Sequence, residues 1–266
     1  MNLLTAWRDF RVDSPPFLLD EDKPLLLPSA DKLIARFDSW QKFTEDSNFG
    51  RSSDTKLHDR LLPIPFIGDV KNAKVVLLLL NPGLEPADYF GEFEVRGFRE
   101  RLERNLRQEF REAEYPFFYL DPDISWHSGY RYWNGKFRGL INELASRDST
   151  CAETRLRFSQ VVACIEMVPY QSAKYGLPEP VRRKLRSVEL AHDYVNDVLR
   201  PRSEAGEVLI VVMRHSKEWG LSKVKNVVVY EGAARRAAHL TPNSEGGKRI
   251  LKFLREHGWP NQTSAL

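Results

Sequence analysis

The sequence predicts a three-layer α/β/α fold, in which helices cover both faces of a central, mostly parallel, four-stranded sheet. Two observations lead to this prediction. Four short runs of aliphatic residues recur along the chain, and stretches with the apolar spacing of amphipathic helices separate them. Strands buried on both faces form continuous aliphatic runs, whereas strands with one face in water alternate apolar and polar residues. We therefore expect a covered sheet, preceded by an N-terminal extension.

The composition indicates a globular protein of the cytoplasm. The chain has 266 residues, 42% of them hydrophobic, and a formal net charge of +3. We expect no membrane partner, because no apolar run reaches the roughly 18 residues that span a bilayer. The first residues also lack the pattern of a signal peptide. Cys151 and Cys164 are too few for a disulfide framework or a four-thiolate metal site.

Each predicted element follows from a local pattern. Residues 1–60 are expected to form an extension that packs on a main domain of residues 61–266, with a helix over 29–43. Apolar residues recur every four positions in the amphipathic helix predicted at 98–110, and further helices are predicted at 135–145, 181–199 and 247–257. Continuous aliphatic residues predict the four strands, which we place at 75–80, 158–168, 208–213 and 227–230.

Polar residues lie near the ends of three of these strands. Asn81 follows the first strand, Glu166 lies near the end of the second, and His239 follows the last. In open parallel sheets, ligands bind outside the carboxyl ends of the strands. These residues therefore predict a binding or catalytic site at that edge. The alternative is that they only form turns and surface, because Asn-Pro-Gly is a good turn in any protein.

Two motifs resemble the uracil-DNA glycosylase superfamily. The run VVLLLLNPG, residues 75–83, resembles the strand and Asn-Pro-Gly turn that form the first motif of its mismatch-specific branch. The run HLTPNS, residues 239–244, resembles its second motif, which follows the last strand. The segment YRYWNGKFRGLI, residues 130–141, is similar to the family's aromatic-led helix between the two. The resemblance extends from about Asp69 to about Ile250.

This resemblance implies a DNA-repair hydrolase that cleaves the N-glycosidic bond of a flipped base, either uracil or another modified or mismatched base. The expected partner is DNA, and neither a cofactor, a metal nor a protein partner is implied. His239 would donate a hydrogen bond to the base, while Asn81 would hold the attacking water. Pro82 and Gly83 would shape the turn, in which glycine permits a close approach of backbone to ligand.

The resemblance also assigns residues that bind the base and the DNA. Tyr89 or Phe90 would stack on the extruded base, although both could equally be core aromatics. The residues of the second motif would contact the DNA around the extruded nucleotide, and these are Thr241, Pro242, Asn243 and Ser244.

Glu166 stands where the family has a polar residue, often asparagine, that reads the edge of uracil. An ionised carboxylate only accepts hydrogen bonds, so it would match the exocyclic amine of cytosine or adenine. A neutral Glu166 could donate as well, but burial would first have to raise its pKa. The sequence leaves both forms, and therefore the base, open.

Two other functions remain open. One is a non-catalytic module that keeps the glycosylase fold and binds nucleotides or nucleic acid. The other is a metal-dependent hydrolase that uses Asp121, Asp123 and His127. Basic residues cluster in three places, which are more typical of solvated helix faces than of phosphate tracks. These are Arg182–Lys184 with Arg186, then Arg235–Arg236, and then Arg131, Lys136 and Arg138.

Overall fold

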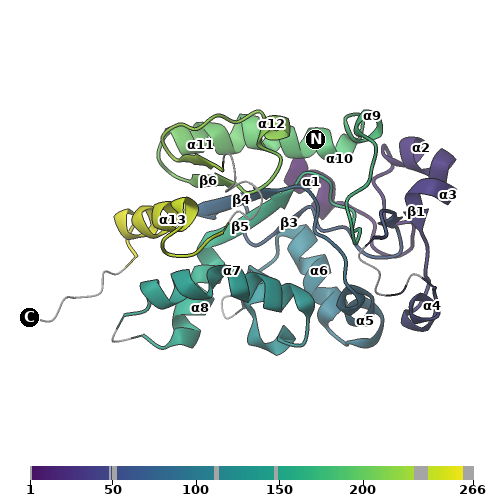
Figure 1. Cartoon of the computed structure of the whole chain (residues 1–266), viewed down its shortest axis with the longest axis horizontal. Coiled ribbons are helices and arrows are strands. Elements are labelled where there is room, and N and C mark those ends of the chain that lie inside the picture. Colours follow the sequence, from purple (N-terminus) through teal and green to yellow (C-terminus); the bar gives the residue numbers. More distant parts are fainter. Residues whose placement is uncertain are drawn as a thin grey trace, which may run out of the picture. The chain divides into compact units, whose positions relative to one another are not determined.

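A computed structural model describes residues 2–47, 49, 53–110, 114–146, 149–230 and 239–259. It confirms a mixed α/β fold with a central, mostly parallel sheet, drawn in Figure 1. The sheet has five strands rather than the predicted four, in the order β3-β5-β4-β6-β7. The strands are β3 (Phe66–Ile67), β4 (Val75–Leu79), β5 (Val162–Glu166), β6 (Leu209–Val212) and β7 (Val227–Val229).

The hydrogen-bond pattern gives the direction of the strands in the sheet. β4 runs parallel to β6, with Val75 opposite Leu209, and β6 runs parallel to β7. The strand that the sequence did not predict, β3, runs the other way. The amide of Ile64 donates to Pro169 and the amide of Glu166 donates to Pro65, so residue numbers rise on one strand as they fall on the other. A strand of two residues carries no periodicity that a sequence pattern could detect.

The chain divides into two compact units, each built from separated segments. Unit 1 comprises residues 1–66, 80–109 and 165–198, and unit 2 comprises residues 67–79, 110–164 and 199–266. The predicted N-terminal extension, residues 1–60, lies wholly within unit 1, together with two segments from later in the chain. None of the helices in the described part of the chain is both long and apolar enough to cross a membrane.

Unit 1 is mostly helical and carries a small parallel pair of strands. Its strands are β1 (Ile34–Ala35) and β2 (Leu57–His58). Its helices are α1 (Leu3–Arg8), α2 (Lys23–Leu26), η1 (Leu27–Ser29), α3 (Ala30–Leu33), α4 (Trp40–Thr44), α5 (Pro86–Glu94), α6 (Phe98–Arg107), α9 (Glu179–Arg182) and α10 (Arg186–Tyr194), with the π-helical turn η4 (Val195–Leu199) after it.

The prediction of one helix over 29–43 is wrong. Ile34 and Ala35 leave the helix to pair with Leu57 and His58 as a parallel ladder. A new helix, α4, then begins after Ser39, whose hydroxyl accepts from the amide of Lys42 at 3.1 Å. Tertiary pairing and a local cap together divide one predicted helix into two.

The long helix predicted over 181–199 is also divided. Leu185 adopts an extended conformation between α9 and α10. Asp22 lies at this break, where its carboxylate accepts from the amide of Arg186 at 2.5 Å. The same carboxylate accepts from the hydroxyl of Tyr170 at 2.6 Å. A residue from the N-terminal segment therefore caps the first turn of α10, which sequence spacing could not reveal.

Unit 2 carries most of the sheet. Its helices are η2 (Phe118–Leu120), η3 (Pro122–Ile124), α7 (Ser128–Leu144), α8 (Cys151–Val161), α11 (Arg200–Glu204), α12 (Ser216–Trp219) and α13 (Glu245–Glu256). In Figure 1, α7 and α8 lie on one side of the strands, and α11 and α12 lie on the other. The first residues of the strand predicted over 158–168 belong instead to α8, and β5 begins at Val162.

An aromatic core holds α7 and α8 together within unit 2. Trp133 stacks on Phe137 with ring centroids 5.3 Å apart, and Phe137 meets Phe158 of α8 edge-on at 5.0 Å. Phe117 packs edge-on against Trp133 at 4.9 Å. All four side chains are almost fully buried. This packing buries one face of α7 and leaves its other face to solvent.

Candidate functional site

Asn81 lies in unit 1, two residues after the end of β4. The carbonyl of its neighbour Leu80 accepts from the amide of Val168 at 2.8 Å. The side-chain amide of Asn81 donates to the hydroxyl of Ser172 at 3.0 Å. Because the amide group is planar, this bond directs its oxygen away from Ser172. Gly83 follows with φ at +77°, a conformation that other residues rarely adopt, so the turn requires glycine for its backbone shape.

Glu166 ends β5 and is only 3% exposed. Its Oε2 atom has no hydrogen-bond partner among the described residues. Burial raises the pKa of Glu166 well above its ordinary value, because the charged form loses its hydration. The buried side chain therefore keeps its proton at pH values where an exposed glutamate is ionised. A neutral carboxyl group offers one donor and one acceptor side by side.

The segment after β5 is held firmly against the N-terminal part of unit 1. Gln171 donates from its side chain to the carbonyl of Leu62 at 3.1 Å, and its own carbonyl accepts from the amide of His58 at 3.0 Å. Gln171 and Ser172 are both almost fully buried. The side-chain oxygen of Gln171 also lacks a partner among the described residues. Sequence reasoning missed both residues, because no local pattern marks them.

Tyr89 is a core residue of unit 1, which corrects the expectation that it stacks on a base. Its ring stacks on Phe43 with centroids 4.1 Å apart, and it is parallel to Phe93 at 5.9 Å. Its hydroxyl lies 3.0 Å from Nδ1 of His58, and the side chain is fully buried. Phe90, by contrast, is 38% exposed. Of the two aromatic residues, Phe90 is therefore the one whose side chain solvent reaches.

The second motif forms a turn in unit 2 between β7 and α13. Tyr230, directly after β7, donates its hydroxyl hydrogen to the carbonyl of His239 at 2.5 Å, while the His239 side chain is exposed. The Tyr230 oxygen also accepts from the amide of Gly246 at 3.2 Å. The last strand and the first turn of α13 therefore fix the position of His239.

Ser244 is the N-cap of α13. Its hydroxyl accepts from the amide of Gly247 at 3.1 Å and donates to the carbonyl of Thr241 at 2.7 Å. This structural role occupies the hydroxyl that was expected to contact DNA. Pro242 packs on α7, since a Cβ atom on Gly139 would lie 2.8 Å from its Cδ. Thr241 and Asn243 are exposed.

The geometry gives no support to a metal-dependent hydrolase. Asp121 accepts from the amide of Asp123 at 3.0 Å, and His127 accepts through Nδ1 from the amide of Gly129 at 2.9 Å. Burial lowers the pKa of His127 to about 4, which keeps the ring neutral as an acceptor. Among the described residues, no three His, Cys, Asp or Glu side chains lie close enough together to hold a metal.

Most of the first basic cluster is engaged within unit 1. Arg182 is buried and donates to the sulfur of Met167 at 3.5 Å. Arg183 pairs with Glu179, and Arg186 pairs with Glu189 at 2.6 Å. Burial and ion pairing of these three arginines fit a helix face rather than a phosphate track, which is the interpretation that the sequence favoured. The pair Arg235–Arg236 lies outside the described residues.

The fold and site define a class of α/β protein that carries polar groups at the carboxyl ends of its strands. Asn81 and Glu166 both belong to unit 1, near the ends of the neighbouring strands β4 and β5, and His239 belongs to the turn of unit 2. Comparisons with known protein families, with curated proteins and with solved structures find no match. The function must therefore be argued from the residues of this chain.

Proposed function

We propose that this protein is a DNA glycosylase of the cytoplasm, which hydrolyses the N-glycosidic bond of a flipped base on a three-layer α/β/α scaffold. The observation that carries the proposal is the pairing of two groups in unit 1. An asparagine amide, held by Ser172, follows β4, and a buried neutral carboxyl group ends the neighbouring strand β5. The two motifs that resemble the uracil-DNA glycosylase superfamily add support.

The chemistry needs little from the protein beyond position and polarity. The bond between the sugar carbon and the base nitrogen breaks, and the base leaves with the electron pair. Water adds to the sugar carbon, and the proton that it loses passes to the surrounding water, from which the departed base anion takes up a proton. Asn81 accepts a hydrogen bond from this water through its amide oxygen and orients it, but an amide is too weak a base to remove the proton fully. The second motif offers His239 as the donor to the departing base, and one such donor contributes roughly 3 kcal/mol to the barrier.

Glu166 supports a base that carries a carbonyl next to an N–H group. A neutral carboxyl group presents a donor and an acceptor in the same arrangement as the amide of asparagine. It can therefore donate to O4 of uracil and accept from the adjacent N3–H. An ionised carboxylate would repel O4. The raised pKa of Glu166 therefore supports uracil as the base.

Duplex oligonucleotides that contain a single uracil, hypoxanthine or mismatch test the proposal. After incubation with the protein, alkali cleaves any strand at an abasic site. We expect cleavage at the uracil by the natural protein and a strong loss in the variants Asn81→Ala and His239→Ala. The matched control is Asn72→Ala, because Asn72 is an exposed amide that donates to the nearby Asp69 at 2.8 Å.

The same experiment can overturn the proposal. A folded natural protein that cleaves none of these substrates is no glycosylase. If such a protein is nevertheless stabilised against heat by an oligonucleotide, then the non-catalytic binding module takes its place. Equal cleavage by the natural protein and by Asn81→Ala would equally remove Asn81 from the reaction.

A further inference from the structure

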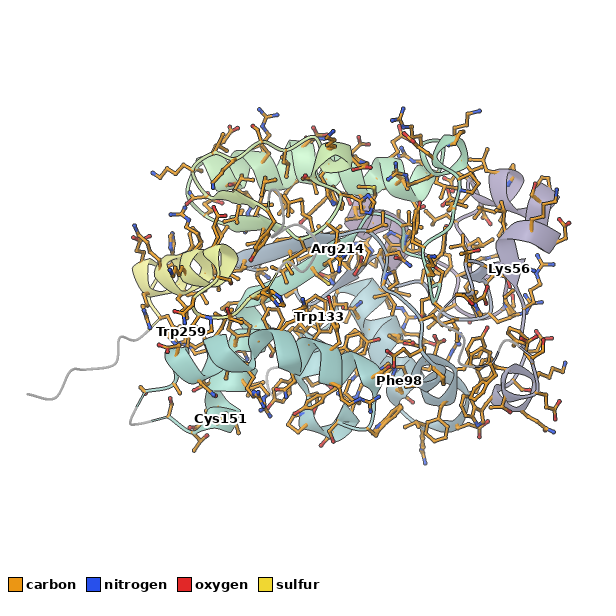
Figure 2. The ribbon with its side chains drawn as sticks, in the orientation of Figure 1. Lys56, Phe98, Trp133, Cys151, Arg214 and Trp259 are labelled. Carbon is orange, nitrogen blue, oxygen red and sulfur yellow. The ribbon has the colours of Figure 1, made fainter. Side chains whose placement is uncertain are left out.

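Four aromatic rings form a surface patch on unit 1, where α4 and α5 lie side by side. Trp40 of α4 meets Phe90 of α5 edge-on with ring centroids 5.5 Å apart, and it meets Phe49 edge-on at 5.9 Å. Phe93 lies on α5 one turn after Phe90. In Figure 2, side chains fill the space between α4 and α5, to the right of the labelled Phe98. We call Trp40, Phe49, Phe90 and Phe93 the aromatic patch.

The aromatic patch gathers most of the large apolar side chains that solvent reaches. Five large hydrophobic side chains are exposed among the described residues, and three of them, Phe49, Phe90 and Phe93, belong to the patch. Trp40, which joins two of these rings, is partly buried. Single exposed apolar side chains are ordinary on a protein surface, whereas contiguous ones mark interaction sites. The aromatic patch is therefore a candidate docking surface.

An inner layer of buried rings supports the aromatic patch. Tyr89 stacks on Phe43 with ring centroids 4.1 Å apart, and both side chains are buried. Phe43 meets Phe49 edge-on at 5.3 Å, and Tyr89 lies parallel to Phe93 at 5.9 Å. The exposed rings thus rest on a packed core. Because these rings are already held in place, a ligand that covers them loses little free energy to their ordering.

The chain around the aromatic patch is acidic. Residues 38–46 contain three acidic residues and one lysine, and residues 85–94 contain four acidic residues and no basic one, although the whole chain has a net charge of +3. Two of these seven acidic residues, Asp88 and Glu92, are buried beneath the surface. The other five give both helices of the patch a negative outer side.

The distribution of ion pairs leaves this negative charge uncompensated. Asp38 pairs with Lys42 at 3.6 Å and with Arg60 at 2.5 Å. Three exposed carboxylates form no ion pair with the described residues, and these are Glu45, Glu85 and Glu94. Glu94 lies one helical turn after an exposed ring of α5, so its carboxylate is beside the aromatic patch.

The sign of this charge decides which partner matches the aromatic patch. Nucleic-acid bases stack on exposed rings, but every phosphate of a nucleic acid is negative and is repelled by the carboxylates. Arginine fits both features of the surface. Its planar guanidinium group stacks on aromatic faces and also forms ion pairs with carboxylates.

We propose that the aromatic patch binds an arginine-containing segment of a partner protein. Guanidinium groups of that segment stack on the exposed rings, and Glu94 pairs with one of them. This inference goes beyond the proposed function and does not depend on it. It gives Phe90 a role other than stacking on an extruded base.

Fluorescence anisotropy with a labelled peptide that alternates arginine and proline tests this proposal. Proline keeps the probe extended and leaves the arginine side chains accessible. We expect Phe90→Ala to weaken binding roughly two- to fivefold, which is the value of one exposed cation–π contact. Glu94→Lys should weaken binding at least as much, because it replaces attraction with repulsion, and the double variant should weaken it further. Salt should weaken binding by the natural protein more than by Glu94→Lys.

Two matched variants control for the general loss of a ring or a charge. Tyr132→Ala removes an exposed aromatic ring from unit 2, and Glu100→Lys makes the same charge change on α6. Both should bind the peptide as the natural protein does. Phe90→Leu keeps an apolar side chain and removes only the ring, so it replaces Phe90→Ala if the midpoint of thermal unfolding falls in that variant.

Several outcomes would overturn the proposal. One is that the natural protein and the double variant bind the peptide equally, or that neither binds it. Another is that Phe90→Ala loses binding to single-stranded oligothymidine but keeps the peptide, which would assign the patch to nucleic acid. A third is a dimer that Phe90→Ala dissociates without any effect on peptide binding, which would assign the patch to a second copy of this chain.

The cleavage assay separates this proposal from the glycosylase proposal. A protein that binds the peptide through the aromatic patch but cleaves none of the oligonucleotides keeps the docking surface and ends the glycosylase proposal. A protein that cleaves uracil-containing DNA, but binds the peptide no better than the double variant does, keeps the glycosylase proposal and ends this one.

Discussion

The two polar regions of the molecule are built in opposite ways. In unit 1, the side chains at the end of β5 are buried, with Glu166 3% exposed and Ser172 1% exposed. In unit 2, the turn of residues 239–244 exposes His239 to solvent, and its shape is held by Tyr230 and by the N-cap of α13. One region is defined by the burial of side chains, and the other by the path of its backbone.

This difference decides how each region can act. Burial removes water from Glu166, so the environment determines its protonation and gives a neutral hydrogen-bonding edge. The turn is exposed to water, so its hydrogen-bond donors can bind a ligand in a defined position only if the backbone holds them in place. Substitutions in unit 1 should therefore act on chemistry and on pH dependence. Substitutions in the turn should act through geometry.

The largest effect is expected for Asn81→Ala. Removing a positioned polar group from the reacting centre costs roughly 10²–10³-fold in rate. Asn81 is only partly buried, so the variant should remain folded, with a midpoint of thermal unfolding close to that of the natural protein. Single-turnover cleavage of a uracil-containing duplex measures the loss.

Ser172→Ala is the companion variant, because the hydroxyl of Ser172 accepts from the side-chain amide of Asn81. Its loss in rate should be smaller than that of Asn81→Ala, and both variants should keep the DNA affinity of the natural protein. A larger loss for Ser172→Ala than for Asn81→Ala would mean that the hydroxyl, and not the amide, meets the substrate.

Gly247→Ala tests whether the backbone path defines the turn. A Cβ atom on Gly247 would lie 1.8 Å from the carbonyl oxygen of Thr241, so the turn or the helix must move. We expect a loss of about 1–3 kcal/mol in the free energy of unfolding, measured with urea. Gly135→Ala is the control on α7, where the new Cβ atom meets nothing within 4 Å. It should leave stability unchanged or raise it by up to about 1 kcal/mol.

Glu166→Gln tests the neutral carboxyl through the pH dependence of stability. Burial raises the pKa of Glu166 in the folded state, so above about pH 4.5 the unfolded chain loses a proton that the folded chain keeps. Stability from this group is therefore complete at low pH and decreases as pH rises, by up to about 1.4 kcal/mol per pH unit. The glutamine variant lacks this decrease and should be more stable than the natural protein at neutral pH.

Two other buried carboxyl groups also make stability decrease as pH rises. Burial raises the pKa of Asp88 to about 7 and that of Glu92 to about 8. The pH profile of Glu166→Gln should therefore be shallower than that of the natural protein, but not flat. Glu94→Gln, at an exposed position, should leave the profile unchanged. An unchanged profile in Glu166→Gln would mean that Glu166 is ionised in the folded protein.

The parts of the fold that the sequence predicted are those with a strong local signal. Aliphatic runs located β4 and β6, and the spacing of Phe98, Leu102 and Leu106 located α6. The elements that it missed depend on distant partners. Asp22 interrupts a predicted helix more than a hundred residues away, and β1 forms only because β2 pairs with it. No local pattern records such contacts.

In the candidate site, too, the sequence predicted the features with a local signal and missed those that depend on distant contacts. The Asn81 turn was predicted because it directly follows an aliphatic strand, and the structure places it there. The protonation of Glu166 could not be predicted, since it depends on how completely neighbours from elsewhere in the chain bury the group. Ser172 was missed because a serine carries no signal until the fold brings it to 3.0 Å from the amide. Tyr89 was misassigned because aromatic residues in cores and in binding sites look alike in sequence.

Ser244 gives the smallest effect and the sharpest test of how the turn works. Ser244→Ala removes the N-cap of α13 and should cost about 1 kcal/mol in the free energy of unfolding. Ser244→Asp keeps a capping oxygen and adds a negative charge at a helix N-terminus, so stability should be retained. If the turn faces the phosphates of DNA, however, that charge must weaken DNA binding, measured by anisotropy, although the fold is intact. Retained affinity in Ser244→Asp would place the turn away from the nucleic acid, whereas weakened binding at unchanged stability supports a DNA-facing turn, because a variant that merely recaps the helix adds no contact to DNA.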